Sequence, residues 1–307
     1  MHVLILGAGA IGSLLGARLA GTQVRISLFS TDREHIEAIR RSGLFIEELD
    51  GSLTNHTLPG FDEARRVPDD LDLVIVCVKS YATEAAVSGI RRVQRPSTVF
   101  LTLQNGIGNW EAIAGLTGWG SVLAGTTALG ATRVAPGRVR HGGNGPTLIG
   151  EPKGPASERA RAIARLFKEA GLDAGVSDDV ERLIWEKLIV NAGINAVTAL
   201  TGIRNGVIAE SAEASAVCRA AVEEAVLVAR ARGLDIEPDM AGRVLEVARA
   251  TARNRSSMGQ DVDSRQRTEI GAINGAIINF AKQAGIDVPV NRMLTCLVKT
   301  LEANYPS

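Results

Sequence analysis

The chain has 307 residues, a length that predicts two domains of ordinary size. Apolar residues make up 45% of the sequence and charged residues 22%, as in soluble globular proteins. The 34 basic and 34 acidic residues balance, so no basic surface for nucleic acid is expected. No apolar run is expected to reach the length of a membrane span, and residues 1–6 lack the basic start of a signal peptide. We therefore expect neither nucleic acid nor a membrane as a partner.

The three cysteines, Cys77, Cys218 and Cys296, are far apart and follow no metal-ligand spacing. Each lies in a strand-like or helix-like run, so we interpret all three as reduced core residues and expect no metal site. Reduced core cysteines are typical of a cytoplasmic protein, which is the location we expect.

Strand-like and helix-like segments alternate in the first half of the chain. The first strands and helices are expected at 2–6, 10–20, 24–29, 33–41, 44–48, 52–57, 71–78, 82–91 and 97–103, with a turn at Asp50-Gly51. The run 71–78 is almost continuously apolar, as in a buried strand of a parallel sheet. The stretch 120–150, rich in Gly, Thr and Val, predicts short strands that extend the same sheet, followed by a helix at 156–170. This alternation predicts βαβ units in a doubly wound sheet.

The pattern becomes helical after residue 178. Helices are expected at 179–200, 211–232, 238–252, 265–284 and 290–303, with a polar loop at 254–264. The change in composition predicts a domain boundary near residues 174–177.

A glycine motif, Gly7-Ala8-Gly9-Ala10-Ile11-Gly12, follows the first predicted strand and opens the first predicted helix. Gly7 allows a tight turn, Gly9 lets a pyrophosphate approach the backbone, and Gly12 allows close helix–strand packing. The N-terminus of the helix attracts the pyrophosphate through its N–H groups and its dipole. A glycine-rich turn without a nucleotide is the alternative. Together with the alternating first half and the helical second half, the motif predicts an α/β protein with a Rossmann-type dinucleotide-binding domain at 1–176 and an all-α substrate and catalytic domain at 177–307.

The end of the second predicted strand bears on the choice between NAD and NADP. NAD sites carry an acid there for the ribose 2′-OH, but Ser30 and Thr31 occupy the expected positions and are neutral. Asp32 is interpreted as the N-cap of the next helix. Because the expected acid is missing, and Arg33 could reach a 2′-phosphate, we favour NADPH over NADH.

Two further polar residues, Lys79 and Asn105, follow later strands of the predicted sheet. The carboxyl ends of strands in an open α/β sheet are where ligands bind. Each residue has two possible roles. Lys79 either contacts a ligand or is a solvated surface lysine, and Asn105 either contacts a ligand or only forms a turn.

Lys187, Asn191 and Asn195 lie four residues apart in an otherwise apolar helical segment. They share one helix face and form a narrow polar stripe. A helix this apolar is buried, and a buried lysine needs a partner. A small anionic or carbonyl substrate would provide one. The alternative is a lysine at the rim of a core helix, with the Asn side chains bonded to backbone.

Over its whole length the chain resembles the ketopantoate reductases (2-dehydropantoate 2-reductases). The matching segments are 7–12, 78–79, 104–106, 125–127 with position 131, 185–195, 205–206, 254–261 and 268–275. Relatives often carry Arg where this chain has Ser30 and Thr31, which leaves Arg33 as the substitute. Gln104 replaces a His found in some relatives.

The resemblance implies roles for individual residues. It implies that Lys187 is the catalytic acid and that Glu269 serves both the reacting centre and the cofactor side. From the sequence alone, Glu269 is an acid in the first turns of the helix 265–284, favoured there by the helix dipole. The resemblance also implies substrate contacts from Asn105, Asn191, Asn195, Asn205 and Ser257, and cofactor contacts from Lys79, Asn105 and Ala131.

The predicted function is NADPH-dependent reduction of 2-dehydropantoate to pantoate, in pantothenate biosynthesis. A lysine close to a ketone can stabilise the charge that hydride addition leaves on oxygen, and then donate a proton. The substrate, a small keto acid, is expected in a cleft between the domains. The alternatives are a reductase of another 2-oxo or 3-hydroxy acid and a non-catalytic NADP(H)-binding sensor. A homodimer is compatible with the sequence.

Overall fold

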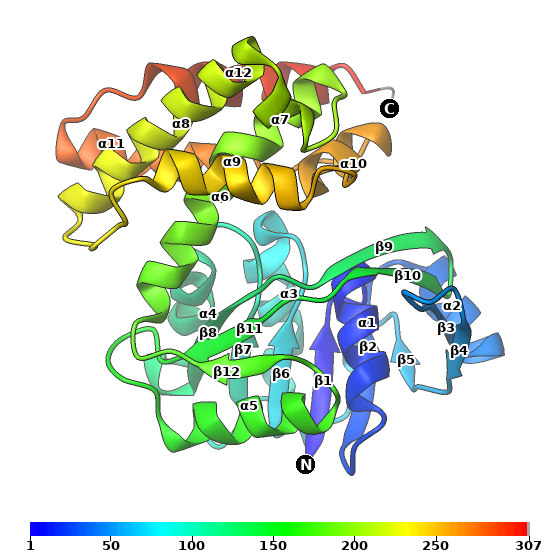
Figure 1. The fold of residues 1–307 in the computed structure, drawn as a ribbon. Coiled ribbons are helices and arrows are strands. Elements are labelled where there is room, and N and C mark those ends of the chain that lie inside the picture. The colour runs from blue at the N-terminus through cyan, green and yellow to red at the C-terminus, as the bar shows by residue number, and fades with distance from the viewer. Residues whose placement is uncertain (306–307) are drawn as a thin grey trace. The chain divides into compact units, whose positions relative to one another are not determined.

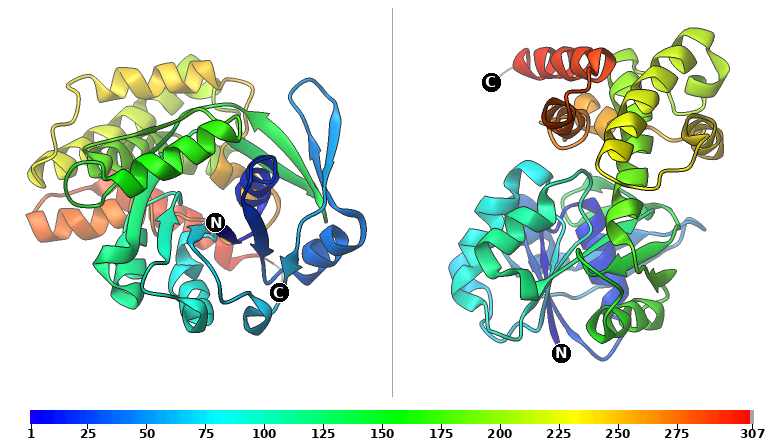
Figure 2. Two further views of the ribbon diagram at one scale, coloured as in Figure 1. Left: turned by 90° about the horizontal axis from the view of Figure 1, so that it is seen from below. Right: turned by 90° about the vertical axis from the view of Figure 1, so that its left-hand side faces the viewer.

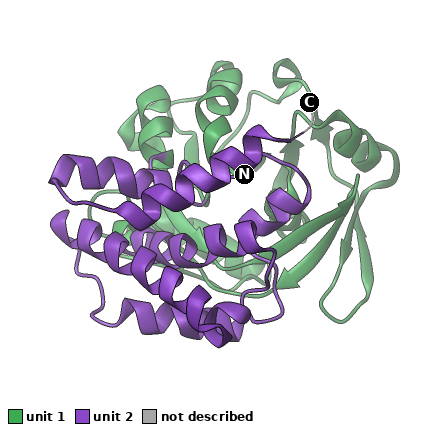
Figure 3. Cartoon of the chain, turned by 90° about the horizontal axis from the view of Figure 1, so that it is seen from above, with its two compact units in different colours: residues 1–104, 109–181 green, residues 105–108, 182–307 purple. Residues whose placement is uncertain are grey.

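The computed structural model describes residues 1–305, which divide into two compact units. Unit 1 comprises residues 1–104 and 109–181, and unit 2 comprises residues 105–108 and the chain from residue 182 onward (Figure 3). The division falls inside the long helix α6 (Val180–Thr201), a few residues after the boundary predicted from composition.

The core of unit 1, among the described residues, is an eight-stranded sheet in the order β12-β11-β8-β7-β6-β1-β2-β5. Neighbouring strands are parallel except for β8 and β11, which are antiparallel. The central strands β1 and β6 are buried along their whole length, because helices cover both faces of the sheet. The bounds of the strands are β1 (His2–Leu6), β2 (Arg25–Phe29), β5 (Gly60–Phe61), β6 (Leu73–Val76), β7 (Val99–Thr102), β8 (Val122–Thr127), β11 (Thr147–Gly150) and β12 (Ala174–Val176).

Helices α1 (Ala10–Leu19) and α5 (Glu158–Glu169) lie on one face of this sheet, and α3 (Thr83–Ile90) and α4 (Asn109–Thr117) lie on the other (Figure 1, Figure 2). From β1 the chain runs outward through β2 to β5. It then returns to β6 on the other side of β1 and continues to β7 and β8. This reversal between β1 and β6 is a topological switch point, where open α/β sheets bind ligands. The predicted doubly wound α/β fold is confirmed.

A second sheet of unit 1 contains, among the described residues, the strands β4-β3-β10-β9 in that order. The strands that flank Asp50-Gly51 form the predicted hairpin, β3 (Leu44–Glu47) with β4 (Leu53–His56). The expectation that the whole stretch 120–150 extends the main sheet is wrong, because β9 (Gly130–Ala135) and β10 (Arg138–Gly143) belong to this second sheet. Along β10 buried and exposed residues alternate, so one face packs on α1 and the other faces solvent.

Helices are the only regular secondary structure among the described residues of unit 2. The predicted helix at 265–284 is wrong in its first part, since α11 begins only at Asn274 and Ile273 departs from helical backbone geometry (φ −102°, ψ −94°). Part of the predicted loop 254–264 is helical instead, because Ser256 caps α10 by accepting a hydrogen bond from the Gly259 N–H (3.0 Å). Glu269 therefore lies in a turn before α11.

After α6, the helices are α7 (Val207–Glu210), α8 (Ala212–Ala231), α9 (Met240–Ala250), α10 (Ser257–Asp263), α11 (Asn274–Ala284) and α12 (Pro289–Ala303).

Helix α6 corrects the expectation that no segment is long and apolar enough to cross a bilayer. Within the described part of the chain, this one helix passes that test by length and composition. However, 72% of its most apolar window is buried inside the structure. Burial of this extent is typical of the core helix of a folded domain.

The cysteines differ in their surroundings. Cys218 is buried and Cys77 is half-buried, and burial raises the pKa of each thiol to about 12. The expectation of a core position is wrong for Cys296, which is exposed on α12. That helix buries Leu294 and Val298 along one stripe and leaves position 296 on its outer face.

Candidate active site

The loop between β1 and α1 is shaped by its glycines. Gly7 has a φ of +107°, and a Cβ there would lie 2.5 Å from the backbone nitrogen of Val78. A Cβ at Gly12 would lie 2.2 Å from the carbonyl oxygen of Gly7, whereas a Cβ at Gly9 would meet nothing within 4 Å. Packing therefore requires glycine at the first and last positions, and Gly9 leaves the backbone open to a ligand.

Helix α1 faces this opening with an uncapped N-terminus. Its N-cap residue, Gly9, has no side chain to accept hydrogen bonds, and its first turn, which begins with Ala10 and Ile11, contains no acid. Such a terminus is suited to bind an anion. The N–H groups of Gly7 and Ala8 both donate to the Phe29 carbonyl (2.9 and 2.8 Å), which holds the loop against the end of β2. These features fit the pyrophosphate of the dinucleotide predicted from the motif.

A buried histidine that no sequence motif indicated supports this loop. The Gly137 N–H donates to His35 Nδ1 (3.0 Å), so Nε2 carries the ring proton and donates to Ser13 Oγ (3.1 Å). Ser13 Oγ in turn donates to the Ala8 carbonyl (3.2 Å). Burial and the positive charge of Arg133 lower the pKa of His35, which keeps the ring neutral. No local pattern signals this role, because the partners come from distant segments.

Asp32 caps helix α2 (Arg33–Ser42), as expected, by accepting a hydrogen bond from the His35 N–H (3.0 Å). The same carboxylate forms an ion pair with Arg133 of β9. Arg33 is exposed, and its charge adds to the hydrogen bond from Arg40 in lowering the pKa of Asp62.

Lys79 directly follows Val78, the residue against which Gly7 packs, so it lies at the switch point between β1 and β6. The side chain of Gln104 donates to the Val78 carbonyl (2.8 Å) and ties the ends of β6 and β7 together. Ala131 on β9 is half-buried and packs against the core of unit 1. The structure thus places Lys79 near the glycine loop and Ala131 on the sheet that packs on α1.

In unit 2, the polar stripe of α6 lies on a largely buried helix. Lys187 and Asn191 are half-buried, and Asn195 is 5% exposed. Burial lowers the pKa of Lys187 to about 8, and the nearby carboxylate of Glu269 partly offsets this effect. The amide of Asn105 donates to Glu269 Oε2 at 3.5 Å, a long hydrogen bond. The structure therefore brings Lys187, Glu269 and Asn105 together.

The turn that carries Glu269 and the loop that carries Asn105 pack against each other within unit 2. The Ile107 N–H donates to the Ala272 carbonyl (3.2 Å), and a Cβ at Gly106, whose φ is +83°, would lie 2.6 Å from the same oxygen. The Ala272 N–H in turn donates to the Glu269 carbonyl (3.0 Å). This packing fixes both backbones at the site.

A second polar group forms where α6 meets α10. The amide of Asn195 donates to Ser257 Oγ (3.4 Å), and Ser257 is otherwise exposed. Asn205 donates through Nδ2 to Thr251 Oγ1 (3.0 Å), and its backbone N–H donates to the Asn254 carbonyl (3.1 Å). The Oδ1 atom of Asn205 is buried without a hydrogen-bond partner, which is uncommon unless a ligand or water supplies a donor.

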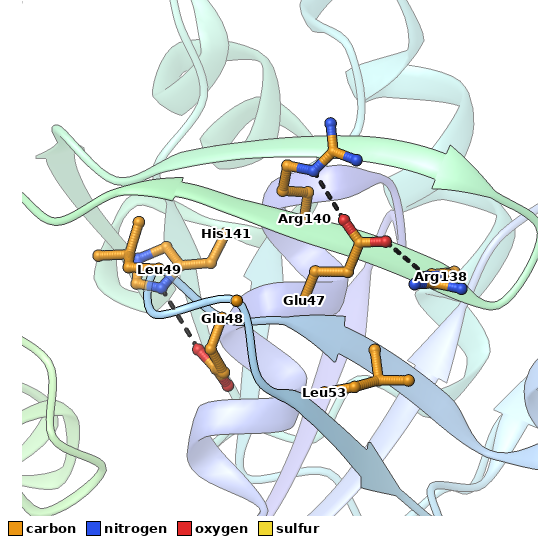
Figure 4. Close-up of a pocket in the computed structure, with 8 residues that line it drawn as sticks. Glu47, Glu48, Leu49, Leu53, Arg138, Arg140 and His141 are labelled. Atoms are coloured by element: carbon orange, nitrogen blue, oxygen red, sulfur yellow. Dashed lines mark hydrogen bonds and ion pairs between the residues drawn. The ribbon is translucent and has the colours of Figure 1, made fainter.

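A pocket of about 270 Å³ lies on the second sheet of unit 1, and none of the predicted site residues lines it (Figure 4). Its acids are already paired, Glu47 with Arg138 and Arg140 (2.7 Å each) and Glu48 with Arg18 (2.5 Å). We assign this pocket no part in the chemistry. Within residues 1–305, no group of three His, Cys, Asp or Glu side chains could hold a metal ion.

Comparison with known proteins identifies the family. Residues 3–154 match the family model described as ketopantoate reductase PanE/ApbA, and residues 179–302 match the model of its C-terminal part. The 2-dehydropantoate 2-reductase of Halobacterium salinarum is 40% identical over 299 residues, which cover 97% of this chain and 98% of that protein. The corresponding protein of Archaeoglobus fulgidus is 38% identical over 308 residues, with 98% of each chain covered.

Solved structures agree with this result. A PanE/ApbA family ketopantoate reductase from Ralstonia eutropha is similar with a TM-score of 0.91 and 32% identity, covering 99% of each chain. D-mandelate dehydrogenase, in a ternary structure with NADH and anilino(oxo)acetate, is similar with a TM-score of 0.93 and 26% identity, also over 99% of each chain. The chain belongs to the ketopantoate reductase family, whose members are NAD(P)-binding oxidoreductases.

Proposed function

We propose that the protein is an NADPH-dependent 2-dehydropantoate 2-reductase, which reduces ketopantoate to pantoate in pantothenate biosynthesis. The observation that carries this proposal is the group formed by Lys187, Glu269 and Asn105, in which burial lowers the pKa of the lysine to about 8. Relatives named 2-dehydropantoate 2-reductase, up to 40% identical over nearly the full length, support the substrate. A cytoplasmic location and a homodimer stay predictions.

Lys187 is the proposed proton donor. Reduction of a ketone develops negative charge on its oxygen, and a protonated amine close to that oxygen stabilises the charge and then transfers a proton. A pKa of about 8 leaves Lys187 mostly protonated at neutral pH and makes it a stronger acid than an ordinary lysine. The charge of Glu269 favours the protonated amine and so keeps it ready to donate.

The remaining donors of unit 2 are proposed to bind the substrate. Asn191, Asn195, Asn205 and Ser257 offer amide and hydroxyl groups suited to carboxylate and hydroxyl oxygens. Asn195 lies about 12 Å from Lys187 along the axis of α6, at 1.5 Å per residue. A substrate that contacts both residues must therefore extend along the helix.

The glycine loop is proposed to hold the dinucleotide, which supplies the hydride when bound. Gly7, Gly9 and Gly12 shape the loop, and the uncapped N-terminus of α1 suits the pyrophosphate. Further contacts on the cofactor side are proposed for Lys79, Asn105, Ala131 and Glu269, while Arg33 stays the sequence-based prediction for the 2′-phosphate.

A second candidate is a reductase of another 2-oxo acid. D-mandelate dehydrogenase has the same fold, and its structure contains NADH rather than NADPH. Fold similarity at 26% identity therefore allows a different acid and a different cofactor.

Steady-state kinetics with each substrate and cofactor separate these candidates. We expect the highest kcat/KM with ketopantoate and NADPH. A preference for benzoylformate, the ketone corresponding to mandelate, together with NADH would favour the second candidate. Tight NADPH binding without turnover of any keto acid would favour a sensor.

A further inference from the structure

Arg133 reaches the cofactor side of unit 1 from the second sheet. On the antiparallel pair β9–β10, Arg133 lies opposite Val139, and Ala131 lies opposite His141. Residues opposite each other in such a pair point to the same face of the sheet. Val139 and His141 are buried on the face that packs on α1, so Arg133 also points to that face.

The guanidinium of Arg133 lies near the end of β2, where a dinucleotide-binding sheet contacts the adenosine ribose. It pairs with Asp32, three residues beyond the end of β2, and its charge lowers the pKa of the buried His35. The last residue of β2, Phe29, accepts hydrogen bonds from both Gly7 and Ala8 of the pyrophosphate loop. In this fold, the group at the ribose 2′ position is bound at the end of the second strand.

Arg33 is the less suitable of the two arginines. It lies in the first turn of α2, and its charge acts on Asp62, which already forms an ion pair with Arg40 (2.6 Å). Arg133 is instead paired with the residue that caps α2. The guanidinium of Arg133 and the carboxylate of Asp32 both lie beside the end of β2 and the glycine loop proposed to bind the pyrophosphate.

We propose that Arg133 binds the 2′-phosphate of NADPH, and that Asp32 is the opposing charge that limits how strongly NADPH is preferred over NADH. This inference rests on the proposed function for the presence of a nicotinamide cofactor. With NADPH, the guanidinium turns from Asp32 to the phosphate, and Asp32 stays bonded to the His35 N–H. With NADH, the carboxylate of Asp32 is the natural acceptor for the ribose 2′-OH. The preference for NADPH over NADH is then set by the attraction of the 2′-phosphate to Arg133 and its repulsion from Asp32.

Direct binding of each cofactor, measured by calorimetry in the absence of substrate, tests this assignment. Arg133→Gln is expected to raise the Kd of NADPH by about 10- to 100-fold, the usual loss for hydrogen bonds to a charged group, and to change the Kd of NADH little. Arg133→Lys, which keeps the charge but not the paired donors, should lose only part of the preference. Asp32→Asn retains a good N-cap, and it should tighten NADPH and weaken NADH.

Arg33→Gln is the matched control, since it removes the neighbouring arginine and leaves Arg133 in place. Loss of NADPH affinity in Arg33→Gln but not in Arg133→Gln would overturn the inference, as would equal losses for NADPH and NADH in Arg133→Gln. If NADPH binding depends on Arg133 but ketopantoate is not reduced, the proposed substrate fails and the inference stands. If the wild-type protein binds neither cofactor, both fail together.

Discussion

Replacing Lys187 with Met tests two effects of the lysine charge. One is its role in catalysis, and the other is the free energy that its burial costs the folded state. The methionine has a similar length and no charge, so it fills the same space beside Glu269 without a proton to donate. We expect kcat for ketopantoate to fall by about 100-fold or more, the usual scale for the loss of a general acid. In the wild-type protein, kcat/KM should fall as the pH rises through about 8, because the amine loses its proton there.

The same substitution should stabilise the fold at neutral pH. The pKa of Lys187 is lowered from 10.5 to about 8, which corresponds to about 3 kcal/mol at 1.36 kcal/mol per unit. Below pH 8 the lysine is protonated in both the folded and unfolded states, so the folded state carries this full cost. The cost is relieved as the pH rises from about 8 through 10.5, because the folded state then releases its proton first. Lys187→Met should therefore raise the free energy of unfolding by up to about 3 kcal/mol at pH 7 and by less at pH 10.

Scanning calorimetry at pH 7 and pH 10, together with steady-state kinetics at pH 7, measures both effects. Lys282→Met is the control, since Lys282 is exposed on α11 of the same unit and should change neither quantity. A variant that keeps a kcat near that of the wild type would show that Lys187 is not the proton donor. A variant that melts below the wild type at pH 7 would show that the buried charge does not destabilise the fold.

Substitutions at three further positions test the packing and the substrate contacts. Asn195→Ala should lower kcat/KM for ketopantoate by about 10- to 100-fold but affect the shorter pyruvate little, and an equal penalty for both acids would assign Asn195 a structural role. Gly106→Ala should lower both the melting temperature and kcat, because it forces a Cβ to 2.6 Å from a backbone oxygen at a φ of +83°, and an unchanged melting curve would contradict this packing. Glu302 accepts a hydrogen bond from the Thr268 N–H (2.7 Å) beside Glu269, so Glu302→Ala should lower kcat more than it raises KM, and Glu302→Gln should restore the rate if the role is positioning.

The sequence by itself was sufficient for the features that depend on local spacing. The glycine motif could be identified from residues 7–12, because a strand, a tight turn and a helix start follow one another in the chain. The stripe of Lys187, Asn191 and Asn195 follows from the helical period alone. The alternation of strands and helices was likewise sufficient for the doubly wound fold.

The tertiary structure alone decided the contacts between distant segments. Three features join residues that are far apart in the chain. Asp32 pairs with Arg133, His35 and Ser13 support the glycine loop, and β9 and β10 belong to a separate sheet. Glu269 lies in a turn and not in a helix for a similar reason, since the loop at 105–108 packs against that turn. Periodicity and spacing describe neighbours along the chain, whereas these pairings depend on which surfaces pack together once the chain has folded.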